Sequence, residues 1–253
     1  MTWWRQERHG PDYMNRLYAT ERAFNTDKIK PVIVMGGGAA GTAAAIAAAR
    51  HGAKVTLLER EKNISYEINK KLALDSAPEN GDCDDSLLIS EAPPLVNSVL
   101  RQFGLKEAAD FLKSLGSGLM DELERLQVEV IFGCTVVEIA REKEFYWTVV
   151  TAMGDLWIEF KANALVMAVG TGEGYRHNDG AGLFILKKLG VPPPPKLTAR
   201  MISYKTLGLT EDNANVYLAG ELVKPDEWDC VSPLHWALAT GHIAGKGAAN
   251  AAI

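Results

Sequence analysis

Three glycines with a fixed spacing follow a short apolar segment and could bind phosphate. Val32–Met35 is entirely apolar and predicts a buried strand, and Gly36, Gly38 and Gly41 follow it at the spacing G-x-G-x-x-G. In this arrangement the first glycine permits a tight turn, the second leaves room for a pyrophosphate, and the third lets a helix pack closely on the strand. The helix then directs its N-terminal amides at the phosphates. The residues predicted to hold them are Gly36, Gly38, Ala39, Ala40 and Gly41.

An acidic residue at the end of the next predicted strand fits the same site. The small residues of 42–51 predict a helix that Gly52 ends, and 55–59 predicts a second strand. Glu59 ends that strand, where a carboxylate accepts hydrogen bonds from ribose hydroxyls and repels a phosphate. The pattern favours FAD or NAD over NADP, and Arg60 belongs to the same predicted site. If the glycines only made a tight turn, Glu59 would have no explanation.

Composition and charge restrict the class of protein. The chain has 253 residues, 47% of them hydrophobic, which suffices for one large α/β domain or two small ones. Its net charge of -5 argues against nucleic-acid binding. The three cysteines, Cys83, Cys134 and Cys230, fit neither a disulfide framework nor a metal site. We expect a cytoplasmic protein without a membrane span, because the N-terminus is too charged for a signal peptide.

The remaining sequence predicts an arm followed by one domain. Residues 1–29 combine aromatic and charged side chains and predict a helical arm that lies on the domain or mediates homo-oligomer formation. Residues 30–253 form the predicted domain, in which 62–86 is irregular and 192–195 is a polyproline connector. Helices are expected at 92–111, 116–126, 180–189 and 234–252. A strand and a β-meander are expected within 128–160, at 128–132, 135–139, 145–151 and 156–160, and further strands at 164–170 and 216–220.

Three of the predicted strands end in residues suited to one elongated ligand. Ligands of parallel sheets bind at the carboxyl ends of the strands. Those ends carry Gly36 and Gly38, then Gly170 with Thr171, and finally Gly220 with Glu221. One ligand could therefore touch all three.

This pattern resembles the FAD domains of the glutathione-reductase type. The resemblance implies an α/β fold, a Rossmann-like three-layer domain with a parallel central sheet and a β-meander. It also implies that Glu221 bonds the ribityl or phosphate region of FAD, and that the helix starting at Pro233 and Leu234 directs its N-terminus at the flavin. The further FAD-binding residues that we predict on this basis are Val136, Ala168, Gly170, Thr171 and Gly220.

A narrower resemblance covers about residues 30–250. Residues 220–245 are similar to the C-terminal signature of the BaiN-like NAD(P)/FAD-dependent oxidoreductases, and 179–190 echoes another family segment. Members of that family carry a large substrate-covering insertion before the last strand, where this chain has only 191–215. The glycine-rich family segments are replaced here by 77–84 and 230–233. The resemblance therefore implies FAD binding, with NAD(P)H as a possible electron donor, but not the substrate chemistry of the family.

Three residues, Cys83, Cys230 and His235, are candidates for a catalytic role. Cys83 corresponds to a family position near the flavin, but a lone cysteine is more often a small buried hydrophobe. Cys230 is expected closer to the flavin, where neighbouring acids would raise its pKa. His235 could donate a proton from the start of the last helix, and His242 lies on the same helix face as a core or surface residue. No histidine and carboxylate cluster has the spacing of metal ligands.

Three functions follow from these observations. The first is a flavoprotein oxidoreductase that passes hydride or electrons through a non-covalent flavin to a small substrate or a redox partner protein. The second is an FAD-holding electron-transfer or structural subunit of a larger complex, which the missing insertion and the aromatic arm suggest. The third is a thiazole-synthase-like enzyme, which ranks lower because its last strand should not end in Gly-Glu.

Overall fold

The computed structural model describes most of the predicted domain. The described residues are 30–64, 94–104, 106–107, 110–111, 118–142, 146–170, 181–192, 197–210, 213–224 and 233–252. The predicted arm at 1–29 lies outside them, as do most of the segment at 62–86 and the connector at 192–195. Cys83, Thr171 and Cys230 lie outside them too.

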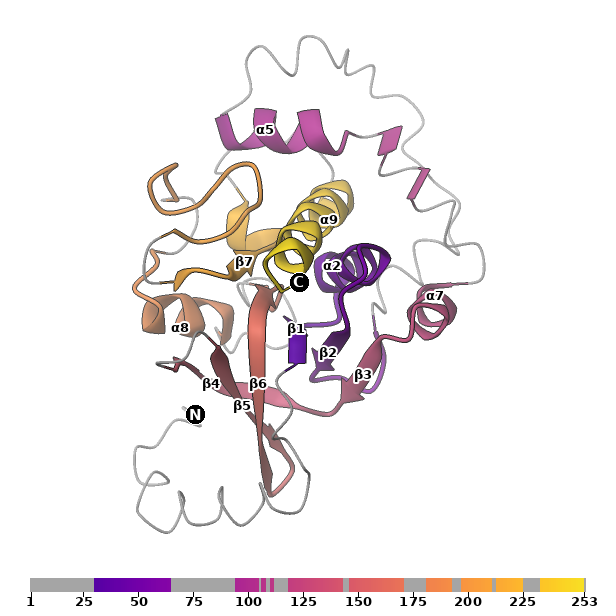
Figure 1. Ribbon diagram of the computed structural model, residues 1–253, viewed down its shortest axis with the longest axis vertical. Helices are drawn as coiled ribbons and strands as arrows, with labels where there is room; N and C mark the ends of the chain where they lie inside the picture. Colours follow the sequence, from indigo (N-terminus) through magenta and orange to yellow (C-terminus); the bar gives the residue numbers. More distant parts are fainter. Residues whose placement is uncertain are drawn as a thin grey trace.

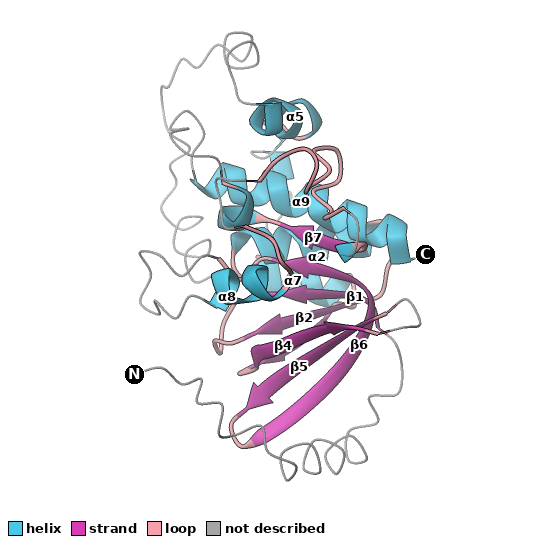
Figure 2. Ribbon diagram, turned by 90° about the vertical axis from the view of Figure 1, so that its left-hand side faces the viewer, coloured by secondary structure: helices cyan, strands magenta, loops and turns pink. Residues whose placement is uncertain are grey.

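A seven-stranded sheet forms the centre of the described part of the chain (Figures 1 and 2). Its parallel strands run in the order β3-β2-β1-β6-β7. Their bounds are β1 Lys30–Met35, β2 Val55–Glu59, β3 Glu129–Phe132, β6 Leu156–Met167 and β7 Val216–Leu218. Val32 to Met35 are fully buried, as expected for a parallel strand covered on both faces. The predicted fold class, α/β with a parallel central sheet, is confirmed.

The predicted β-meander forms from β4 (Thr135–Arg141), β5 (Trp147–Met153) and the first half of β6. The prediction of separate strands at 156–160 and 164–170 is wrong, because β6 runs without a break from Leu156 to Met167. Its first half alternates in burial beside β5, and its last residues are buried between β1 and β7. Where β6 passes from β5 to β1, Trp147 Nε1 donates to the carbonyl oxygen of Ala214 at 3.1 Å. This bond ties the meander to the segment that enters β7.

Two helices pack together on one side of the sheet, and the meander extends away from them (Figure 2). They are α2 (Ala39–Arg50) and α9 (Pro233–Ala252). At Gly241 and Gly245 of α9, a Cβ atom would overlap the backbone of Ala40 and Ala44 of α2. The glycines thus permit a close crossing that fixes the start of α2 against α9. Helix α2 begins three residues earlier than predicted, directly after Gly38.

Shorter helices cover the outside of this core. They are α5 (Pro94–Gln102), α7 (Leu119–Arg125) and α8 (Ala181–Lys188). The prediction of one helix over 92–111 is wrong, because α5 ends at Gln102. The next residue, Phe103, is buried, and its ring stacks on His242 of α9 with ring centres 4.5 Å apart. In the described residues, no helix combines the length and the apolar character needed to cross a membrane.

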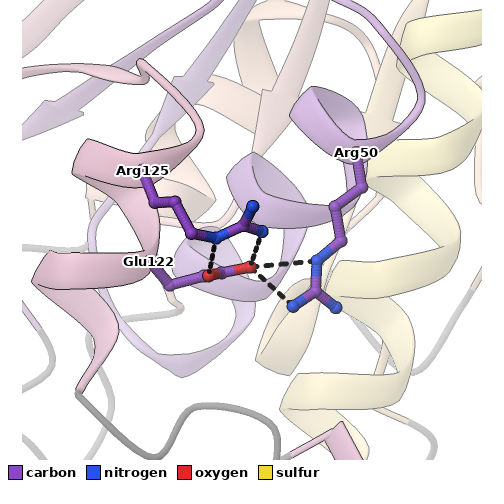
Figure 3. Close-up of polar contacts among 3 residues, drawn as sticks. All are labelled: Arg50, Glu122 and Arg125. Atoms are coloured by element: carbon purple, nitrogen blue, oxygen red, sulfur yellow. Dashed lines mark hydrogen bonds and ion pairs between the residues drawn. The ribbon is translucent and has the colours of Figure 1, made fainter.

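An ion-pair cluster attaches α7 to the far end of α2 (Figure 3). The buried carboxylate of Glu122 accepts hydrogen bonds from Arg125 Nε at 2.7 Å and from Arg50 Nη2 at 2.6 Å. The hydrogen bond from Arg125, with that from Arg50, lowers the pKa of Glu122 to about 2 although burial opposes this shift. The cluster stabilises the packing of the sheet-covering helices.

Candidate functional site

The three predicted glycines form a turn between β1 and α2, each in a different environment. Gly36 has φ +95°, and a Cβ there would lie 2.6 Å from the carbonyl oxygen of Ala168. A Cβ on Gly41 would overlap the carbonyl of Gly36. Gly38 is exposed, has an ordinary φ of -69°, and has no atom within 4 Å of where a Cβ would be. The fold requires glycine at 36 and 41, whereas at 38 glycine leaves open space.

The open space at Gly38 adjoins the N-terminus of α2. The first intrahelical hydrogen bond runs from the amide of Thr42 to the carbonyl oxygen of Gly38, at 2.9 Å. The amides of Ala39, Ala40 and Gly41 precede it and therefore have no acceptor within the helix. Gly38, the N-cap, has no side chain to cap them. The first turn of α2 can therefore donate to an anion.

Glu59 lies against this turn, at the carboxyl end of β2. It is buried, and its carboxylate accepts hydrogen bonds from the amide of Gly37 and, at 2.6 Å, from the amide of Glu61. A carboxylate offers about four lone-pair sites, so two backbone bonds leave capacity for hydroxyl groups. Sequence reasoning missed Gly37, where a Cβ would come within 2.7 Å of Glu59 and of Ile64. The signal for it was the uninterrupted Gly-Gly-Gly run.

The start of β4 lies beside the end of β2. The amide of Cys134 donates to the carbonyl oxygen of Glu59 at 3.1 Å, which places the half-buried Val136 two residues further along this edge. Arg60 follows Glu59, and its exposed side chain lies 3.6 Å from Glu61. Burial raises the pKa of the Cys134 thiol to about 11. Cys134 is therefore a protonated core residue and not a nucleophile.

The three predicted strand ends converge. The residue after β6, Ala168, contacts Gly36 of the glycine turn, and its amide donates to the carbonyl oxygen of Met35. A Cβ on Gly170, which has φ +67°, would lie 3.4 Å from the carboxylate of Glu221. A Cβ on Gly220 would lie 3.0 Å from the side chain of Ala40 in α2. Contacts thus run continuously from the glycine turn through β6 to the turn after β7.

Helix α9 begins near the same edge. Pro233 is its first residue, a position that suits proline because the first amides of a helix have no internal partner. Leu234 and His235 follow and are half-buried. His242 lies elsewhere, packed among Phe103, Phe111 and His51. Burial, with His51, Lys246 and Arg50 nearby, lowers the pKa of His242 to about 4, so its ring is neutral at neutral pH.

These elements define a Rossmann-like α/β fold with a β-meander. Residues 31–64 match the family described as FAD dependent oxidoreductase. This match supports FAD as the predicted cofactor. A comparison with curated protein sequences gave no significant match.

Two solved structures share the fold with this chain. One is bacillithiol disulfide reductase Bdr (YpdA) from Bacillus cereus, with 13% identity and a TM-score of 0.50 over 89% of this chain and 99% of that one. The other is the open conformation of a flavocytochrome c3 fumarate reductase, with 15% identity and a TM-score of 0.51 over 74% of this chain. This chain spans 44% of the length of the fumarate reductase.

The described residues fit FAD along the carboxyl ends of the parallel strands, both at the glycine turn after β1 and at the turn after β7. Free amides and open space at Gly38 suit a pyrophosphate, and the carboxylate of Glu59 suits a ribose. Glu221 lies at the other end, beside Gly170. These polar groups are compatible with an elongated dinucleotide.

Proposed function

We propose that this chain binds FAD non-covalently along the carboxyl ends of β1, β2, β6 and β7 and serves as a flavoprotein oxidoreductase. The observation that carries the proposal is Gly38, which is exposed, unstrained and open at the N-terminus of α2. Its conformation does not require glycine, and the open space beside it supports the proposal that a pyrophosphate binds there.

Each end of the cofactor has assigned residues in this proposal. The amides of Ala39, Ala40 and Gly41 hold the pyrophosphate, and Glu59 accepts hydrogen bonds from the adenosine ribose. Glu221 and the helix start at 233–234 hold the flavin end, where the positive end of a helix favours negative charge. A bound flavin would supply hydride or electron transfer.

The reacting partners are inferred from resemblance. The similarity of 220–245 to BaiN-like oxidoreductases suggests NAD(P)H as electron donor, and a small molecule or a redox partner protein stays the predicted acceptor. His235 is the described residue that could donate a proton, because it is half-buried in the first turn of α9. Cytoplasmic location and a homo-oligomer formed through residues 1–29 stay predictions from the sequence.

A second candidate is an FAD-holding subunit whose partner completes the substrate site. In place of a large insertion, the described part of 191–215 forms bridges close to β7, pairing Ile202 with Leu209 and Gly208 with Tyr217. That segment therefore packs against the domain instead of building a separate lid. Turnover of a small substrate by a monomeric protein would reject this candidate.

Identification of the co-purified ligand tests the proposal. The protein should be yellow, dithionite should bleach it, and mass spectrometry of the extracted ligand should give the mass of FAD. If the extracted ligand were an adenylated thiazole, the result would favour the hypothesis of a thiazole-synthase-like enzyme. A colourless protein that takes up no added FAD would refute FAD binding.

A further inference from the structure

A buried threonine of α9 links this helix to the turn that follows β7. Thr240 is fully buried, and its hydroxyl oxygen accepts a hydrogen bond from the amide of Gly220 at 2.9 Å. The same hydroxyl donates to the carbonyl oxygen of Trp236 at 2.7 Å. Because its only proton is directed at the helix backbone, its lone pairs are left to accept from Gly220.

The turn held by Thr240 contacts both halves of the proposed site. Gly220 has φ +69°, and a Cβ there would lie 3.0 Å from Ala40 in the first turn of α2. Glu221 follows directly, with its carboxylate beside Gly170. Gly241, next to Thr240, lies against the backbone of Ala40. A shift of the Gly220 turn would therefore move Glu221 relative to the amides of α2.

We propose that Thr240 is a positioning residue for the cofactor, which sets the Gly220–Glu221 turn against the N-terminus of α2. This inference rests on the proposed function and adds to it a residue that does not itself touch the ligand. A buried amide that loses its acceptor is destabilised unless the turn moves to find another acceptor. Movement of the turn displaces Glu221 and disturbs the flavin end.

Two substitutions test the inference, one that removes the hydroxyl at constant size and one that keeps the hydroxyl but removes the methyl group. Thr240→Val replaces the hydroxyl by a methyl group, whereas Thr240→Ser keeps the hydroxyl. Thr148→Val is the matched control, because Thr148 is also buried but lies in β5, where its hydroxyl is near Glu142. Each protein is titrated with FAD, and the dissociation constant and the visible spectrum of the bound flavin are recorded. Thr240→Ala replaces Thr240→Val if the latter does not fold.

The inference predicts that Thr240→Val raises the Kd for FAD about tenfold and shifts the visible absorption band of bound FAD. Thr240→Ser and Thr148→Val should keep the wild-type Kd and spectrum. The inference is overturned if Thr240→Val retains the wild-type Kd and spectrum. It is also overturned if Thr148→Val weakens FAD binding equally, because a general loss of stability would then explain the weaker binding. Failure of the wild-type protein to bind FAD would instead refute the proposed function.

Discussion

Replacement of Gly38 by alanine should separate ligand binding from folding. The added methyl group meets no protein atom within 4 Å, and the φ of -69° is one that alanine adopts readily. Alanine reduces the entropy of the unfolded chain but is a poorer N-cap than glycine. These effects oppose each other, so we expect the free energy of unfolding to change by less than about 1 kcal/mol.

The effect on FAD binding should be much larger. The methyl group would occupy the space that the pyrophosphate needs in order to reach the amides of Ala39 and Ala40. Hydrogen bonds to charged groups contribute about 1.5 kcal/mol each at the low end of their range. Loss of two of them costs about 3 kcal/mol, which corresponds to a rise of roughly 100-fold in Kd.

Calorimetric titration with FAD, together with urea denaturation of the apoprotein, measures both quantities. Gly41→Ala is the contrasting variant, because its methyl group would overlap the carbonyl of Gly36 and should destabilise the fold itself. Wild-type affinity for FAD in Gly38→Ala would refute the reasoning, since the open space at Gly38 would then have no role in binding.

Three further predictions concern stability. Gly245→Ala should lower the free energy of unfolding by about 2–3 kcal/mol in urea denaturation, because its methyl group would overlap the backbone of Ala44. Glu122→Gln should cost about 1–2 kcal/mol at pH 7, a modest value because Arg125 is 63% exposed and water screens the pair. The folded-state pKa of Glu122, about 2, lies below its ordinary value of 4.5, so this difference should disappear as pH falls from 4.5 toward 2 in denaturation series. The pKa of His242 is about 4 in the folded state against 6.5 ordinarily, so stability should fall between pH 6.5 and 4 by at most about 3 kcal/mol, and His242→Phe should lack this slope in thermal melts.

Local patterns in the sequence predicted the glycine turn well. The need for positive φ at Gly36 and for close packing at Gly41 follows from spacing that depends only on neighbouring residues. The meeting of Gly170 and Glu221 could also be expected, because parallel strands end at one edge of a sheet.

Features that depend on tertiary contacts were not predictable in this way. The continuity of β6 was hidden because its two halves have different burial patterns, set by different neighbouring strands. Phe103, the residue after α5, stacks on His242, and these two residues are far apart in the sequence. The sequence around Thr240 does not indicate that its hydroxyl accepts a hydrogen bond from the amide of Gly220, which lies 20 residues earlier in the chain. Such partners become visible only once the helices and strands are assembled.

The central claim, that FAD is held by the first turn of α2, is tested most directly by NMR titration of the ¹⁵N-labelled apoprotein with FAD. The amide signals of Gly38, Ala39, Ala40 and Gly41 should shift and saturate at a stoichiometric amount of FAD. Amides at the far end of α2, near Arg50, serve as the internal reference and should stay in place. Binding of FAD that leaves the four signals unmoved would contradict the account.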